Sequence, residues 1–438
     1  MKKTLALVLA LLMVLVVFAG CDFLRGNTAK DQLNVYAFTD EVPGILERFV
    51  ELKGLDEDFF NVTIVATDGG AYQNALDEAL VAGEVDLFCA EAAFIKKYAE
   101  NPLVADVEKD LGITKAEMDA AGLAPYTVDI GINTAGELKG LSFQACGGAF
   151  IYRADLAEAI LGTDDPDDIG EMTDSWEKFF DVARELAEYD GEDFPNGAAI
   201  ISGAGDLFHP IDAGKAQPWV VNGNLVIDKL FYDPAEDALD YFEMARILKQ
   251  ENLSNQTTDW QDAWFADFSG SNERPCFGFY GPAWLINYVL APNCGDTFGD
   301  WRLAVPTVGF YWGGTWLMGV KDSKHLDTVA DIIRWFGTDI SDDGVQAYWA
   351  TRDVVASTVI MDKTDAYWPI LGGEQNAFDI FVPACKAVDG TTLSAYDEKL
   401  NSLLNQQVQS YANDEKTKDE AIEQFKLDAK EAFADISV

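Results

Sequence analysis

The side chains in this chain that could do chemistry are acidic and aromatic. Of 438 residues, 75 are Asp or Glu and 11 are Trp, whereas only His209 and His325 are histidines. Two histidines this far apart exclude an H-E-x-x-H zinc motif, and the chain lacks a G-x-S-x-G turn, a phosphate-binding P-loop and a dinucleotide G-x-G-x-x-G. The aspartates within 163–171 do not have EF-hand spacing, so an acidic turn is favoured over a calcium site. The sequence predicts no metal and no cofactor.

Charge and cysteines narrow the class of protein further. A formal charge of −44 gives no electrostatic affinity for nucleic acid or anionic lipid, and we interpret it as a solubility feature. Five cysteines follow Cys21, an odd number without C-x-x-C spacing, which argues against a disulfide framework and against zinc. Cys276 and Cys294 are placed to bridge the ends of one strand–helix unit, and the sequence leaves that pairing open.

Strands and helices alternate along the chain. Strands are expected at 33–38, 61–65, 85–89, 141–144, 149–152, 277–280 and 316–320, and helices at 43–53, 71–82, 92–98, from 175, at 235–250, from 282 and twice after 394. The order β-α-β-α-β-α predicts an α/β fold with a parallel sheet covered on both faces. Ligands of such sheets bind at the carboxyl ends of the strands, where Asp40, Glu41 and Glu91 lie. The length exceeds what one core usually supports, so we expect two lobes.

Residues 1–21 have the form of an export signal. Lys2 and Lys3 precede an apolar run that ends in Phe18-Ala19-Gly20-Cys21. This ending resembles a bacterial lipobox, although Phe18 stands where the pattern usually has an aliphatic residue. The resemblance implies that residues 1–20 are removed, that Cys21 is diacylated, and that 21–32 tether the protein to the extracytoplasmic face of the cell membrane. An ordinary secretory signal with an incidental cysteine is the alternative.

Several segments resemble family 1 extracellular solute-binding proteins, the maltose-binding-protein-like receptors of carbohydrate ABC transporters. They are 40–43, 87–94, 147–153, 162–166, 175–179, 279–285 and, most distinctive, the W-G-G-T-W of 312–316. The resemblance implies a two-lobe periplasmic-binding-protein-like fold (type II), each lobe a mainly parallel sheet flanked by helices, with a ligand cleft between them. Lobe one would comprise 33–144 plus 277–338, and lobe two 145–276 plus 339–438. Such a receptor closes on its ligand and docks on permease subunits.

Sugar recognition requires flat aromatic rings for the apolar face of a pyranose and carboxylate or amide groups for its hydroxyls. The predicted polar contacts are Asp40, Glu41, Glu91 and Gln144, and the predicted stacking residues are Trp312, Trp284 and Trp260. Trp176 and Trp335 lie on apolar helix stripes and are expected in the core. Trp260 and Trp264 are four apart, so they should share a helix face, with one packed inward and the other on the cleft. His209 fits a structural role and a cleft-edge role equally well.

Three functions are compatible with the sequence. The first is a lipid-anchored, monomeric receptor, not an enzyme, that captures a carbohydrate and delivers it to an ABC importer. The second is a receptor of the same fold for a polyamine or a peptide. The third is a surface glycoside hydrolase, which needs two carboxylates at a defined separation, and acidic residues are too abundant for the sequence to exclude it.

Overall fold

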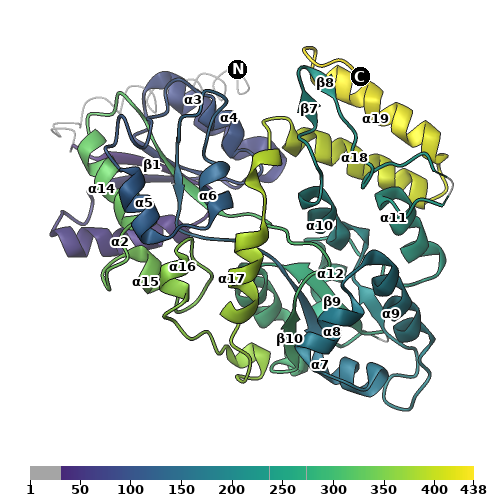
Figure 1. The fold of residues 1–438 in the computed structure, drawn as a ribbon. Coiled ribbons are helices and arrows are strands. Elements are labelled where there is room, and N and C mark those ends of the chain that lie inside the picture. Colours follow the sequence, from purple (N-terminus) through teal and green to yellow (C-terminus); the bar gives the residue numbers. More distant parts are fainter. Residues whose placement is uncertain (1–30, 236, 273) are drawn as a thin grey trace, which may run out of the picture. The chain divides into compact units, whose positions relative to one another are not determined.

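The computed structural model describes residues 31–438 except 236 and 273 (Figure 1). The predicted signal, Cys21 and nearly all of the tether therefore lie outside the described residues. The chain divides into two compact units, Met1–Val85 and Asp86–Val438. We describe each unit by itself.

The first unit contains the predicted β-α-β arrangement. Strands β1 (Leu33–Ala37) and β2 (Phe60–Ile64) are parallel, with α2 (Glu41–Lys53) between them and α3 (Ala71–Ala82) after β2. Alternate residues of β1 are buried, and α2 buries an apolar face, as the sequence patterns predict. Both helices end at glycines in the left-handed region, Gly54 at φ 62° and Gly83 at φ 69°, where a side chain would be strained.

The second unit contains two larger groups of strands and a short antiparallel pair, β7 (Val220–Val221) with β8 (Asn224–Leu225). In the first group, β11 (Thr315–Gly319) lies antiparallel between β3 (Leu87–Glu91) and β4 (Leu141–Ser142). The second group is a four-stranded sheet in the order β10-β5-β9-β6, formed by β10 (Trp301–Ala304), β5 (Ala149–Arg153), β9 (Cys276–Gly281) and β6 (Ala199–Ile201). Of its pairs, β6–β9 is parallel, whereas β10–β5 and β5–β9 are antiparallel. The sheets of this unit are therefore more antiparallel than predicted, because β5 and β11 follow segments that cross from one strand group to the other.

Helices surround these strands in the second unit. They are α4 (Ile95–Ala99), α5 (Lys115–Ala121), α6 (Pro125–Asp129), α7 (Ala154–Leu156), α8 (Pro166–Met172), α9 (Trp176–Glu188), α10 (Phe208–Ala213), α11 (Tyr241–Gln250), α12 (Asp262–Phe268), α13 (Ala291–Asn293), α14 (Leu326–Gly337), α15 (Val345–Trp349), α16 (Thr358–Met361), α17 (Phe378–Ala387), α18 (Asp397–Ala412) and α19 (Lys418–Ala432). Ser175 caps α9 as predicted, by accepting a hydrogen bond from the Lys178 amide at 3.3 Å. The expected helix at 235–250 begins later, at Tyr241, because Asp240 caps it there.

Extended segments cross between the two strand groups. The amide of Trp312 donates to the Cys146 carbonyl at 3.0 Å, that of Gly148 to Phe310 at 2.9 Å, and that of Ala145 to Val354 at 3.3 Å. A Cβ atom on Gly148 would lie 1.9 Å from the Phe310 ring, so this close approach requires glycine. The crossing therefore consists of hydrogen-bonded backbone, as the sequence predicts.

Strand pairing differs from the predicted lobe boundaries in one respect. Strands β9 and β10 pair with β5, whereas the boundaries drawn from the sequence place 277–338 in lobe one with β3. Which strands pair depends on distant partners, and local patterns carry no information about that. The lobe assignment stays a proposal, and we now place 277–304 in lobe two.

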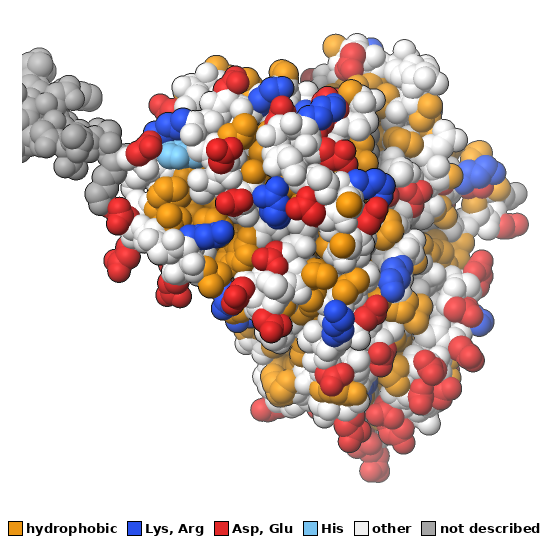
Figure 2. Space-filling view, turned by 60° about the vertical axis from the view of Figure 1, so that its left-hand side comes forward, with side chains coloured by type: hydrophobic (Ala, Val, Ile, Leu, Met, Phe, Trp, Pro, Cys, Tyr) orange, Lys and Arg blue, Asp and Glu red, His pale blue; other side chains and the backbone are white. Residues whose placement is uncertain are grey.

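The surface carries the charged side chains that the composition implies. Acidic and basic side chains are interspersed on the face shown in Figure 2, with acidic side chains gathered at its lower end.

Cys276 and Cys294 are buried free thiols, so the disulfide that the sequence left open is not formed. The Cys276 thiol donates to the Gly278 carbonyl at 3.4 Å and the Cys294 thiol to Ala291 at 3.3 Å.

Candidate functional site

Three of the predicted stacking residues meet in the second unit. The ring of Trp260 lies parallel to that of Trp284, with 6.0 Å between centroids and 12° between planes. The Trp312 ring stands edge-on to both, at 4.9 Å from Trp284 and 6.1 Å from Trp260. We call these three residues the tryptophan cluster. Its rings come from three segments far apart in the sequence, so tertiary packing builds this surface.

A glycine turn and a hydrogen bond hold Trp312 and Trp284 in place. Trp312 precedes Gly313 and Gly314, at φ 75° and φ 113°, which turn the chain into β11. The indole N–H of Trp284 donates to the Trp312 carbonyl at 2.9 Å. A Cβ atom on Gly313 would lie 3.3 Å from that indole nitrogen, so glycine leaves room for the contact. Both rings are only partly buried, as predicted for residues that present a face.

Trp260 departs from the predicted helix. It has φ 66°, a left-handed conformation that is a genuine outlier for a bulky residue, and it precedes α12, which begins at Asp262. Trp264 is fully buried, whereas 51 % of Trp260 is exposed. Trp264 is therefore the inward ring of the pair and Trp260 the exposed one, while a position of Trp260 on a ligand cleft stays a prediction. The predicted shared helix is wrong, because the chain turns at Trp260 before the helix starts.

Glu91 ends β3 beside the tryptophan cluster. Its Oε2 accepts a hydrogen bond from the Ala93 amide at 2.9 Å, and its Oε1 lies 3.6 Å from where a Cβ of Gly313 would be. Burial raises the pKa of this carboxyl from 4.5 to about 7, and the nearby charge of Glu398 adds to the rise. The strand position thus brings an acceptor oxygen next to the Trp312 turn, as the sequence predicts for the carboxyl end of a strand.

Asp40, Glu41 and Gln144 are the other predicted polar contacts. Asp40 is exposed directly before α2, and Glu41 is the first residue of that helix; both belong to the first unit. Gln144 is buried, and its side chain hydrogen-bonds Asp353, whose pKa burial raises to about 7. The structure thus brings Glu91 together with the tryptophan cluster, while a ligand contact by Asp40, Glu41 or Gln144 stays a prediction.

His209 and Asp259 adjoin the tryptophan cluster; the sequence left His209 open between a structural and a cleft-edge role and did not propose Asp259 as a ligand contact. The His209 ring stacks on Trp312, with 4.4 Å between centroids and 22° between planes, and burial lowers its pKa to about 3. It is therefore neutral at physiological pH. Oδ1 of Asp259 is buried next to Trp260 without a hydrogen-bond partner. No local motif could have indicated either role, because each depends on what packs against it.

Of the two tryptophans that were expected in the core, Trp335 is buried, whereas Trp176 is partly buried and packs against the core. Trp176 packs on Phe179 and Tyr280, with centroids 5.7 and 6.2 Å apart. Trp335 is 6 % exposed and donates to the Asp343 carbonyl at 2.8 Å. The periodicity of apolar residues on α9 and α14 therefore separated packing residues from the tryptophan cluster correctly.

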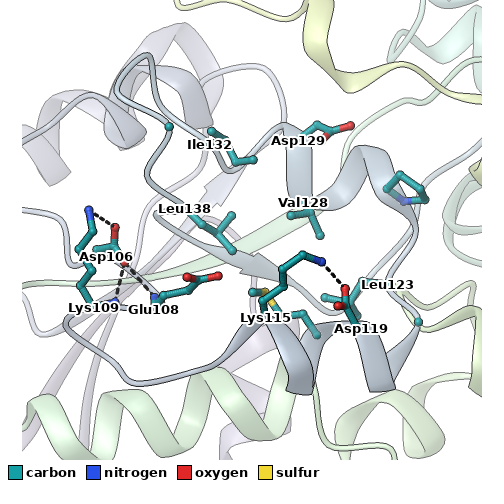
Figure 3. A pocket seen from close by; sticks show the side chains of 14 residues that line it. Asp106, Glu108, Lys109, Lys115, Asp119, Leu123, Val128, Asp129, Ile132 and Leu138 are labelled. Atoms are coloured by element: carbon teal, nitrogen blue, oxygen red, sulfur yellow. Dashed lines mark hydrogen bonds and ion pairs between the residues drawn. The ribbon is translucent and has the colours of Figure 1, made fainter.

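A hollow of about 590 Å³ lies away from these residues, between α5, α6 and the segments 106–109 and 132–138 (Figure 3). None of the predicted site residues lines it. Both of its lysines are already paired: Lys115 contacts Asp119 at 2.6 Å, and Lys109 contacts Asp106 at 3.3 Å. We therefore place the candidate site at the tryptophan cluster, where ring faces and an acceptor oxygen combine.

This arrangement has the chemistry of a binding surface. Partly exposed indole faces pack against the apolar face of a ring-shaped ligand, and carboxylate oxygens accept hydrogen bonds from its hydroxyl groups. Among the described residues no group of three His, Cys, Asp or Glu is placed to hold a metal ion. Within the same residues no helix is long and apolar enough to cross a membrane.

Comparison with known proteins supplies the family context. Residues 50–341 match the model of the family described as bacterial extracellular solute-binding protein. No curated protein matches the chain in sequence.

Solved structures share the fold at low sequence identity. An extracellular solute-binding protein family 1 structure aligns with a TM-score of 0.73 at 17 % identity, covering 92 % of this chain and 99 % of its own. The sugar-binding protein MalE from Xanthomonas citri aligns with 0.69 at 15 %, covering 92 % and 97 %. The galacto-N-biose-/lacto-N-biose I-binding protein from Bifidobacterium longum, solved with lacto-N-biose, aligns with 0.67 at 18 %, covering 93 % and 99 %. The two-lobe solute-binding fold predicted from the sequence is thereby confirmed.

Proposed function

This chain belongs to the bacterial extracellular solute-binding protein family, and on that premise we propose that it captures a carbohydrate for an ABC importer. The single observation that carries the proposal is the tryptophan cluster with Glu91 beside it. A pyranose has an apolar C–H face and a rim of hydroxyls, and it matches a surface that offers ring faces and a carboxylate oxygen.

The structural relatives support the choice of ligand class. The MalE protein of Xanthomonas citri is called a sugar-binding protein, and the Bifidobacterium longum protein was solved with the disaccharide lacto-N-biose. We transfer the ligand class to this chain because the tryptophan cluster supplies the stacking surface that a sugar requires. Three rings offer more contact area than one monosaccharide covers, which favours an oligosaccharide.

Closure on the ligand would couple binding to delivery. We infer that Asp40 and Glu41 add polar contacts from the lobe that contains β1, and that ligand stabilises the closed state by its higher affinity for it. The closed receptor then docks on permease subunits as a monomer. The family and the structural relatives are binding proteins, and we infer that this chain has no enzymatic activity.

We further propose that Cys21 carries the membrane anchor. The apolar run and the small residues before Cys21 support acylation of its thiol after removal of residues 1–20. Replacing Cys21→Ser should release the protein from the membrane fraction into the medium of an expressing Gram-positive host. Retention of the variant on membranes would contradict the lipid anchor and leave carbohydrate binding unaffected.

A thermal-shift screen of the chain after Cys21 tests the carbohydrate proposal. The panel contains maltotriose, galactotriose, lactose, lacto-N-biose, spermidine and a tripeptide, and each sugar is checked by chromatography after incubation. A ligand at a hundred times its Kd stabilises the native state by about 2.7 kcal/mol, which raises the melting temperature by several degrees. A shift with an intact sugar is expected. A shift with spermidine or peptide alone, or recovery of cleaved sugar, would refute the proposal.

A further inference from the structure

The carboxylate of Asp259 is connected to the tryptophan cluster through neighbouring residues on both sides. A Cβ atom on Gly205 would lie 3.2 Å from its Oδ1 and 3.3 Å from its Oδ2, so the short helix Ala204–Leu207 faces this carboxylate. His209 follows four residues after Gly205 and stacks on Trp312. Trp312 in turn contacts Trp260, the residue after Asp259. Asp259 therefore lies at the edge of the surface that we assign to the sugar.

The carboxylate of Asp259 lacks the hydrogen bonds that the neighbouring carboxylate of Asp206 accepts. Asp206 Oδ2 accepts hydrogen bonds from the Ser202 amide at 3.0 Å and the Gly203 amide at 3.2 Å, whereas Oδ1 of Asp259 is buried without a partner. Burial raises the pKa of Asp206 well above its usual range, and the charge of Asp259 adds to the rise; burial also raises the pKa of Asp259 to about 6. Among the described residues neither carboxylate forms an ion pair. A buried acceptor without a hydrogen-bond partner destabilises the free protein.

The backbone next to Asp259 is strained as well. Trp260 has φ 66°, and half of this residue is exposed. Strain of this kind persists where the surrounding structure imposes it, and it concentrates at ligand sites. Two costs to the free protein thus coincide at consecutive residues, at the edge of the tryptophan cluster.

The charges around the cluster have one sign. Glu91 and Asp259 carry the carboxyl oxygens at the cluster, burial raises their pKa values to about 7 and about 6, and the neutral His209 adds no positive charge. The cation at the end of α10, Lys215, is already engaged by Asp212 at 2.7 Å and Asp397 at 2.8 Å. A ligand that brings hydrogen-bond donors satisfies these oxygens, whereas a ligand carboxylate or phosphate would meet like charges without compensation.

We propose that Asp259 is a specificity-determining ligand contact: it accepts a hydrogen bond from a hydroxyl or amino group of the sugar that packs on Trp260, and with Glu91 it excludes acidic sugars. The ligand class is then a neutral or amine-bearing carbohydrate. This inference rests on the proposed carbohydrate function.

Substitution of Asp259 tests the contact. Asp259→Asn should weaken binding of the neutral sugar that gives the largest thermal shift by ten- to a hundredfold. The melting temperature of the free variant should stay the same or rise, because the variant no longer buries a carboxylate whose Oδ1 has no hydrogen-bond partner among the described residues. Asp262→Asn is the matched control, since Asp262 is exposed three residues further on, and it should leave affinity and melting temperature unchanged. The proposal would be overturned if Asp259→Asn bound the sugar with undiminished affinity. It would also be overturned if the loss of affinity came with a lower melting temperature of the free variant.

A second variant tests access to the carboxylate without changing charge. Gly205→Ala places a methyl group against the Asp259 oxygens, at the distances given above, and should weaken binding of the same sugar at least fivefold. Unchanged affinity in this variant would also argue against the contact.

Matched neutral and acidic probes test the exclusion. Galactotriose and trigalacturonate differ only at C6, and lactose and 3′-sialyllactose differ by one acidic residue. The unsubstituted protein should bind the neutral member of a pair at least a hundredfold more tightly, and Asp259→Asn should narrow that ratio. Equal affinity for the neutral and the acidic sugar of a pair would overturn the proposed exclusion of acidic sugars, and the proposed carbohydrate binding would still hold. If no sugar shifts the melting temperature of the unsubstituted protein, the proposed function fails and this inference fails with it.

Discussion

Replacing Glu91 with glutamine should stabilise the free protein at high pH and weaken its binding of sugar. The carboxyl ends β3 beside the Trp312 turn, and burial raises its pKa from 4.5 to about 7. Each pKa unit corresponds to about 1.4 kcal/mol, so the full rise is worth about 3 kcal/mol. Because the side chain is partly exposed, solvent screening reduces the expected gain to about 1–2 kcal/mol.

The sign of the effect follows from the protonation states. Below pH 4.5 Glu91 is protonated in the folded and the unfolded chain, so Glu91→Gln should change the free energy of unfolding little. Between pH 4.5 and 7 the unfolded chain releases the proton while the folded protein retains it, and stability falls as the pH rises. Above pH 7 the folded protein holds a buried charge that glutamine lacks, and the variant should be more stable.

Urea unfolding at pH 4 and pH 8.5 measures this difference, because the titration of all other groups cancels between variant and parent. Glu137→Gln is the control of opposite sign. Lys109 at 2.7 Å and Lys139 at 2.9 Å lower the pKa of Glu137 to about 2, so its stabilising effect is present above pH 4.5 and is lost in acid. A Glu91→Gln variant with the same stability difference at both pH values would refute the assignment of Glu91 as a buried, destabilising carboxylate.

Three further predictions concern side chains of the same unit. Trp312→Ala should weaken sugar binding at least tenfold, since one ring face buried against a sugar is worth about 1–2 kcal/mol. The control Trp368→Phe alters a ring packed on Phe378 and Phe381 and should leave sugar affinity unchanged. Isothermal titration calorimetry of both variants with the sugar measures the difference. Trp260→Gly should be more stable than Trp260→Ala by about 1 kcal/mol, the reverse of the usual order, because only glycine relieves φ 66°; equal urea midpoints would show that no strain is stored there. Alkylation after unfolding without reductant should modify both Cys276 and Cys294, and protection of the pair would reveal a disulfide.

Local patterns were sufficient for much of the fold. The Ser175 cap and the apolar stripe of α9 gave both the start and the buried face of that helix, and the apolar run before Glu91 gave β3 and the place of its terminal carboxylate. Such features depend on residues close in sequence, and the chemistry of caps and the periodicity of side chains encode them directly.

The parts that could not be predicted depend on distant contacts. Thr258 and Asp259 have the residue types of helix caps, yet the carboxylate of Asp259 faces Gly205 and α12 starts only at Asp262. The stacking of His209 on Trp312 and the pairing of β9 with β5 likewise join segments more than a hundred residues apart. Sequence reasoning therefore proposed the three tryptophans and Glu91 as candidates but not Asp259, and it left the role of His209 open.

The close approach of three indoles also gives the protein an optical signature. Trp260, Trp284 and Trp312 have ring centroids within about 6 Å of one another, two parallel and one edge-on, so their electronic transitions couple and excitation energy passes between them. Trp260 is the half-exposed member, and its emission therefore senses water directly. A ligand that covers this ring or moves it would change both the emission wavelength and the coupled circular-dichroism bands. The unlabelled protein thus reports on the occupancy of its own site.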